Sequence, residues 1–168
     1  AADTLATTVS RVANGLTDTT TALDNNFANK FNGLNSQLQE VARLNAAIGK
    51  AAGDIYGNVD LLDRRDQLIR DLASAMGATA ELEPDGQATV FVDGQAVVSG
   101  STSRSLSLVT ALGSAPQVLV AVDGGSIDVT SGLGGELGGL LDARGYTQGY
   151  LSRLDDFAFT FSTQVNAI

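Results

Sequence analysis

The chain has 168 residues, a length that favours one domain with a core large enough to fold without disulfides or metals. It contains no cysteine, histidine or tryptophan, which excludes thiol nucleophiles, Ser-His-Asp triads and zinc sites with thiolate or imidazole ligands. Ten basic and 19 acidic residues give a net charge of -9, so we expect neither nucleic acid nor an anionic membrane as a partner.

Apolar residues recur every three or four positions over the first fifty residues, which predicts one long helix. Its opposite face carries Thr, Asn, Gln and Asp, which are weak helix formers, so packing must stabilise it. Gly15 and Gly33 are weak points inside it, and we expect it to stop in a short loop at 51–57. The apolar face comprises Leu5, Val9, Val12, Leu16, Leu23, Phe27, Phe31, Leu34, Leu38, Val41, Leu44 and Ile48.

A second, shorter helix is predicted to follow this loop. Asn58 or Asp60 can cap its start, and Gly77 supplies a left-handed stop. The acid-before-base spacing predicts two surface ion pairs, Asp60–Arg64 and Asp66–Arg70. One face of this helix comprises Leu62, Arg65, Ile69, Leu72 and Met76.

The period then changes from helical to two, which predicts β-strands. Three Asp-Gly pairs, at 85–86, 93–94 and 123–124, punctuate the alternating runs and indicate hairpin turns. We therefore predict a small antiparallel meander of hairpins over residues 78–130. Its strands are expected at 78–83, 88–92, 95–98, 105–109, 118–122 and 127–130.

The helical period returns from Glu136 to Ile168 and predicts a last long helix. The fold class is therefore α+β, an elongated bundle of long helices with a small antiparallel β-hairpin domain inserted between the second and third helices. We expect the helical bundle at residues 1–77 and 131–168, and the hairpin domain at 78–130. The apolar positions of the last helix include Leu137, Leu140, Leu151, Leu154, Phe157, Phe161 and Val165.

We find no pattern that predicts a catalytic or cofactor site. Five glycines between 132 and 139 miss the phosphate-binding spacing because Leu137 occupies the last position. We interpret them as a close approach of a helix N-terminus to its neighbour. Asp63 and Asp66 share a helical face, but neighbouring arginines favour their charged forms, so an ion-pair network is expected instead of a general acid.

No metal site, membrane span or cleaved signal peptide is predicted either. Asp123 and Asp128 form a faint calcium-like cluster that lacks enough ligands, so we interpret it as a solvated turn. Gly113 and Pro116 interrupt the longest uncharged stretch, 105–122, which excludes it as a span. The first ten residues lack the basic and apolar segments of a secretory signal.

Three motifs, in the same order and at matching intervals, resemble the flagellar hook-associated protein 1 family. The first is Leu-Leu-Asp-Arg-Arg-Asp-Gln-Leu at 61–68, after a long helix that ends in Val-Ala-Arg-Leu-Asn at 41–45. The others are Gly-Ser-Thr-Ser-Arg at 100–104 and Gly-Glu-Leu-Gly-Gly-Leu-Leu-Asp-Ala-Arg at 135–144. The structural motif residues are Leu61, Leu62, Asp63, Arg65, Asp66, Leu68, Gly135, Leu137, Gly138, Gly139 and Arg144.

This resemblance implies a structural, non-catalytic adaptor that joins hook to filament at the hook–filament junction of the bacterial flagellum. It implies no cofactor, and as partners the hook protein and the second hook–filament junction protein. It also implies export without a cleaved signal peptide and an extracellular location in the flagellum. Because the terminal segments of the family are not matched, we expect an internal fragment that is monomeric, whereas the full-length protein self-associates in a ring.

Within the resemblance, we expect Asp63, Arg65 and Asp66 to lock the second helix onto the long ones at the base of the hairpin domain. Two alternatives stay open. One is a different flagellar axial protein, such as the second junction protein, a hook subunit or a filament subunit. The other is a secreted adhesin or binding module, which the Ser/Thr/Gly-rich hairpins would suit.

Overall fold

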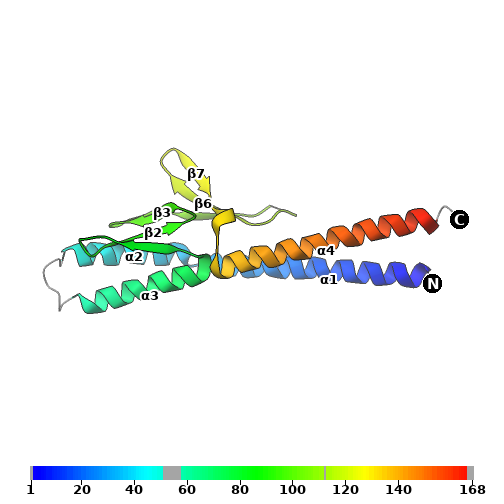
Figure 1. Cartoon of the computed structure of the whole chain (residues 1–168), viewed down its shortest axis with the longest axis horizontal. Helices are drawn as coiled ribbons and strands as arrows, with labels where there is room; N and C mark the ends of the chain where they lie inside the picture. Colours follow the sequence, from blue (N-terminus) through cyan, green and yellow to red (C-terminus); the bar gives the residue numbers. More distant parts are fainter. Residues whose placement is uncertain (1, 51–57, 112, 166–168) are drawn as a thin grey trace.

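The computed structural model describes residues 2–50, 58–111 and 113–165, which form four α-helices and seven short strands (Figure 1). The fold is α+β, as predicted. Two long helices run side by side with both chain ends at one end of the molecule, and the strands cover the other two helices at the opposite end (Figure 1). The helices are α1 (Ala2–Phe31), α2 (Leu34–Lys50), α3 (Val59–Met76) and α4 (Gly135–Val165).

The expectation of one continuous helix over the first fifty residues was wrong, since the chain forms two helices with a turn at 32–33. Gly33 has a φ of +92°, which lies outside the helical range and which glycine adopts without a steric penalty. Helical hydrogen bonding resumes when the N–H of Gln37 donates to the carbonyl of Gly33 at 3.0 Å. Gly15, the other expected weak point, lies within α1. The loop expected at 51–57 lies outside the described residues.

Helix α3 begins at the predicted position and ends as predicted. Asn58 occupies its N-cap position, and Gly77 closes it with a left-handed φ of 74° while its N–H donates to the carbonyl of Ala73. The predicted face is turned inward: Arg65, Leu72 and Met76 are buried, and Leu62 and Ile69 are half-buried.

The first five predicted strands form, and the sixth lies at Gly125–Asp128 in place of the predicted 127–130. The strands make two antiparallel sheets instead of one meander. The four-stranded sheet has the order β1-β2-β3-β4, and the three-stranded sheet the order β5-β6-β7. The two-residue strand β4 was not predicted. Asp93 and Gly94 link β2 to β3 with φ values of 49° and 70°, as a tight hairpin turn of the primed type requires. The strands are β1 (Thr79–Leu82), β2 (Ala88–Val92), β3 (Gln95–Ser99), β4 (Thr102–Ser103), β5 (Leu106–Val109), β6 (Gln117–Val122) and β7 (Gly125–Asp128).

One hydrophobic core joins all four helices to both sheets. Side chains of α1, α2, α3 and α4 meet those of β2, β3, β5 and β6 in this cluster. The short 3₁₀ helix η1 (Thr130–Gly132) then leads into α4. Division of the chain into separate domains at residues 77 and 130 stays a prediction. The core includes Phe27, Phe31, Leu38, Val41, Leu72, Met76, Val90, Val98, Leu106, Val118, Leu133 and Leu137.

Candidate functional site: polar contacts between helices and sheets

Arg65 links α3 to the turn between β1 and β2. Its side chain is only 3% exposed. One terminal nitrogen donates to the carbonyl of Gly86 at 2.5 Å, and Nε and the other terminal nitrogen donate to Oδ1 of Asp66 at 3.0 and 2.8 Å. Asp63 is exposed and is not among these partners. The structure thus brings together two of the three residues expected to lock this helix, and supplies a backbone acceptor as the third group.

Surface ion pairing on α3 differs from the pairs expected at i,i+4. Arg64 contacts Glu40 of α2 at 2.9 Å, and Arg70 donates to Gln67 at 2.9 Å. Glu40 also accepts from Arg43 at 2.6 and 2.7 Å. The hydrogen bond from Arg43 is the main reason that the pKa of Glu40 is lowered, with the charges of Arg43 and Arg64 adding to it. The expected pairs did not form because Arg64 binds Glu40 of α2, and because Asp66 accepts from Arg65 and not from Arg70.

Asn45 of α2 holds the backbone of the four-stranded sheet. It is completely buried, and its Oδ1 accepts a hydrogen bond from the N–H of Ala88 at 3.0 Å. Its Nδ2 donates to the carbonyls of Ala88 at 2.7 Å and Gly100 at 2.9 Å. One side-chain amide therefore satisfies three backbone groups of the sheet and its connection.

Asn35, ten residues earlier on α2, makes the equivalent contact with the other sheet. Its Nδ2 donates to the carbonyl of Leu106 and its Oδ1 accepts from the N–H of Leu106, both at 2.8 Å. Leu106 is the first residue of β5. Helix α2 therefore pairs with both sheets through asparagine side chains that take the place of a neighbouring strand.

The glycine-rich start of α4 lies against the end of α3. A Cβ on Gly135 would meet the carbonyl oxygen of Ser74 at 2.2 Å, so only glycine permits this approach. Gly138 is confined in the same way by the carbonyl of Leu133 at 2.4 Å, whereas Gly139 has open space. Leu137 is completely buried. The interpretation of these glycines as a close helix approach is confirmed for Gly135.

The remaining leucines of the motif are less buried. Leu61 and Leu62 are half-buried, and Leu68 packs against the core from a half-buried position.

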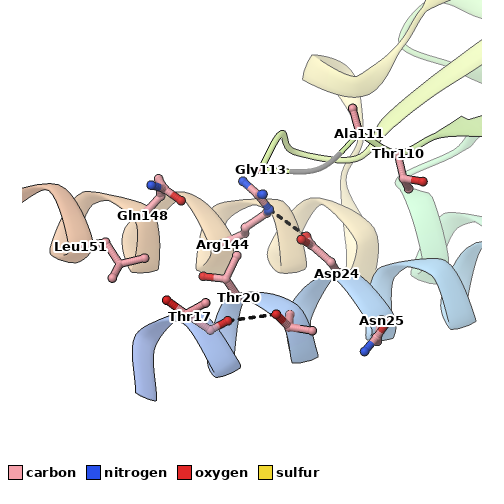
Figure 2. Close-up of a pocket in the computed structure, with 11 residues that line it drawn as sticks. Thr17, Thr20, Asp24, Asn25, Thr110, Ala111, Gly113, Arg144, Gln148 and Leu151 are labelled. Atoms are coloured by element: carbon pink, nitrogen blue, oxygen red, sulfur yellow. Dashed lines mark hydrogen bonds and ion pairs between the residues drawn. The ribbon is translucent and has the colours of Figure 1, made fainter. Parts of the chain in front are cut away.

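Arg144 joins three segments that are far apart in the sequence. Its Nε donates to Oδ1 of Asp24 on α1 at 2.7 Å, and a terminal nitrogen donates to the carbonyl of Ser114, between β5 and β6, at 2.8 Å. The Arg144 side chain is 9% exposed. Figure 2 shows Arg144 and Asp24 pointing toward one another. Both residues line a groove of about 570 Å³. Thr17, Thr20 and Gly113 also line this groove.

Asp128, one of the two carboxylates considered as a calcium-like cluster, is bound by Thr130. Oδ1 of Asp128 accepts from the N–H of Thr130 at 2.8 Å and from its hydroxyl at 2.5 Å. The hydrogen bond from the Thr130 side chain is the main cause of a lowered pKa for Asp128. Thr130 Oγ1 in turn accepts from the N–H of Val118 at 2.8 Å. Asp128 therefore fastens β6 to the start of η1.

Within the described ranges, no cluster of three or more acidic, histidine or cysteine side chains is arranged to hold a metal ion. No helix in these ranges has the length and apolarity that crossing a bilayer requires. The polar side chains of Asn35, Asn45, Arg65 and Arg144 share one property: each binds backbone groups of a strand or turn from a neighbouring helix. Of these four, the sequence analysis had assigned a holding role to Arg65.

Comparison with known proteins points to one family. The family described as Flagellar hook-associated protein FlgK helical domain matches residues 1–168. Flagellar hook-associated protein 1 of Escherichia coli is 33% identical over 154 residues, which cover 85% of this chain and 27% of that protein. The protein of the same name from Salmonella typhimurium is 34% identical over 119 residues, which cover 66% of this chain and 22% of that protein.

A solved structure supports the same relationship. The flagellar hook junction protein FlgK from Burkholderia pseudomallei is similar with a TM-score of 0.69 and 25% sequence identity. The match covers 83% of this chain and 26% of that one. The chain therefore spans about a quarter of the length of these relatives.

Proposed function

Because the chain belongs to the family of the flagellar hook-associated protein FlgK helical domain, we propose that it is a structural, non-catalytic part of a protein that joins the flagellar hook to the filament. The observation that carries this proposal is the family match over the whole chain. The first identified motif supports it from the structure, since Arg65 ties α3 to the sheet beside it. The proposed location is therefore the flagellum, at the hook–filament junction.

The proposed partners follow from the same premise. In the full-length protein they are the hook protein, the second hook–filament junction protein and further copies in a ring. The described helices and sheets are already joined to each other by buried contacts, so we expect this chain alone to be a monomer. Sedimentation velocity at several concentrations should give one constant coefficient, and a coefficient that rises with concentration would contradict the monomer.

Immunogold electron microscopy on whole flagellated cells tests the location. Antibody raised against this chain should label the boundary between hook and filament, and cells that lack the gene should show no label there. Label along the filament would instead favour a different axial protein, and label over the cell body would favour the adhesin. Export without a cleaved signal is tested on the same cells, by mass spectrometry of the mature N-terminus.

A further inference from the structure

The polar contacts divide the molecule into two bodies. We call α2, α3 and the two sheets the base, and α1 with α4 the arm. Asn35, Asn45 and Arg65 fasten the sheets to the helices of the base. Among the hydrogen bonds and ion pairs of the described residues, Arg144 alone fastens the β5–β6 connection to the arm. Three side chains of the base therefore bind the sheets and their connections, whereas among the described residues one side chain of the arm, Arg144, does so.

The chain passes between base and arm at two places, and glycine lies at both. Gly33 separates α1 from α2 with a φ of +92°. The other crossing leads through η1 into α4 and contains Gly134, which packs against Gly77 of the base: a Cβ on Gly77 would meet the Cα of Gly134 at 2.7 Å. The N–H of Gly134 donates to the carbonyl of Met76 at 3.1 Å. Such residues can absorb changes in φ and ψ when two bodies rotate.

Both crossings lie at the same level of the molecule. Lys30, at the end of α1, forms an ion pair of 2.5 Å with Glu136, at the start of α4. Phe27 and Phe31 seat the near end of the arm in the core that it shares with the base. The outer part of the arm extends away from the base (Figure 1). The packed end of the arm can therefore act as a pivot, and the outer parts of α1 and α4 can rotate about it.

Arg144 contacts the base at a distance from this pivot. It lies nine residues into α4, which is roughly 13 Å along the helix axis at 1.5 Å per residue. Its bonds to Asp24 and to the carbonyl of Ser114 are charge-assisted and partly buried. Thr110, Ala111 and Gly113 of this connection line the groove beside it, together with Gln148 and Leu151 of α4 (Figure 2). A contact placed there resists rotation more effectively than one at the pivot.

We propose that the arm and the base bend relative to one another at the joint formed by Gly33, Gly77 and Gly134, and that Arg144 is the stop that sets the angle between them. This device goes beyond the proposed function and does not depend on it, because it follows from the contacts of this chain alone. Breaking the Arg144 contact releases the outer arm while the core at Phe27 and Phe31 stays packed.

Pulsed electron paramagnetic resonance can measure this motion, because the chain has no cysteine that would compete for spin labels. The pair Gln39→Cys and Ser152→Cys places exposed labels on α2 and α4, roughly 33 Å apart along the axis. The pair Gln39→Cys and Asp60→Cys keeps both labels on the base. Each pair is measured in the otherwise unchanged chain, with Arg144→Ala, and with Arg11→Ala, which removes an exposed arginine of α1 that contacts Thr8 of the same helix.

Arg144→Ala should broaden the distance distribution across the joint and leave the pair on the base unchanged. Loss of a charge-assisted hydrogen bond should raise the population of other arm angles by about tenfold. Arg11→Ala should alter neither distribution. If Arg144→Ala fails to fold by circular dichroism, Arg144→Lys keeps the charge without the forked contact and gives the same test. A cross-joint distribution that is unchanged by loss of the fork, or broadening in both pairs alike, would overturn the proposal.

Discussion

Asn45→Ala should destabilise the chain far more than an ordinary surface substitution. The change removes three hydrogen bonds, to the N–H and carbonyl of Ala88 and to the carbonyl of Gly100. Asn45 and Ala88 are both fully buried, so water cannot readily replace the lost partner. Each hydrogen bond contributes about 1 kcal/mol net, and a buried group left without a partner costs about 1–3 kcal/mol. We therefore expect a loss of about 3 kcal/mol in the free energy of unfolding.

Urea unfolding followed by circular dichroism at neutral pH measures this loss, with Asn29→Ala on the exposed side of α1 as the matched control. The control should change the free energy of unfolding by less than about 0.5 kcal/mol. In a thermal scan, a 3 kcal/mol loss corresponds to a fall of about 6–12 °C in Tm for a chain of this size. The reasoning fails if Asn45→Ala and Asn29→Ala unfold at the same urea concentration with the same slope.

Asn45→Asp separates the acceptor from the donor part of this contact. A carboxylate can still accept from the N–H of Ala88, but it would face two carbonyl oxygens that in the unchanged chain accept hydrogen bonds from the amide of Asn45. At neutral pH this variant should be less stable than Asn45→Ala because a charge is buried against acceptors. The deficit should shrink as the pH falls, since protonation removes the charge and restores one donor. A deficit that stays constant from pH 7 to pH 4 would show that these carbonyls do not face the side chain.

Three further predictions concern other contacts. Arg65→Ala should lower the free energy of unfolding by about 1–3 kcal/mol because it removes a buried donor to the β1–β2 turn. Arg64 is exposed, so Arg64→Ala should lower it by less than about 1 kcal/mol. Equal losses for the two variants in urea unfolding would refute this difference. Gly77→Ala should lower the free energy of unfolding by about 1–3 kcal/mol, because φ at Gly77 is positive and a Cβ there would lie 2.7 Å from the backbone of Gly134. Gly15 lies in open space within α1, so Gly15→Ala should raise the free energy of unfolding by about 0.5–1 kcal/mol. Shifts of Tm in the same direction for both variants would contradict this. The pKa of Glu40 is lowered, so the stabilisation that its carboxylate provides is present above the ordinary value of 4.5 and is lost as the pH falls through the folded value. The stability gap to Glu40→Gln should therefore narrow as the pH falls below 4.5, and a gap that stays the same from pH 7 to pH 3 would exclude this linkage.

The helices and most strands could be predicted because their signals are local. Hydrophobic period, the Asp-Gly turns and the stop at Gly77 each act within a few residues. The break at Gly33 escaped prediction because Phe31 and Leu34, on either side, are both buried and keep the apolar spacing across it. The separation into two sheets depends on which strands pair across space, which the spacing of strands along the chain does not specify.

The contacts that join helices to sheets were harder to predict. Arg65 was expected to pair with two nearby carboxylates, but one of its acceptors is a carbonyl 21 residues away, which spacing on the helix cannot show. One feature of the sequence pointed to Asn45: it is a polar residue next to the apolar face that includes Leu44 and Ile48. Its acceptors lie 43 and 55 residues away, and only the folded chain brings them within reach.

The pairing of α1 with α4 has a consequence for the order of folding. Asp24 and Arg144 are separated by 120 residues, whereas the β2–β3 hairpin closes over two. Closing a long loop costs more chain entropy than closing a short one, so hairpins and neighbouring helices should form before the arm. A chain still being synthesised holds α1 without its partner until α4 has been made. The packing of α1 on α4 is therefore a late event in folding, and it can take place only after the polypeptide between the two helices has been synthesised.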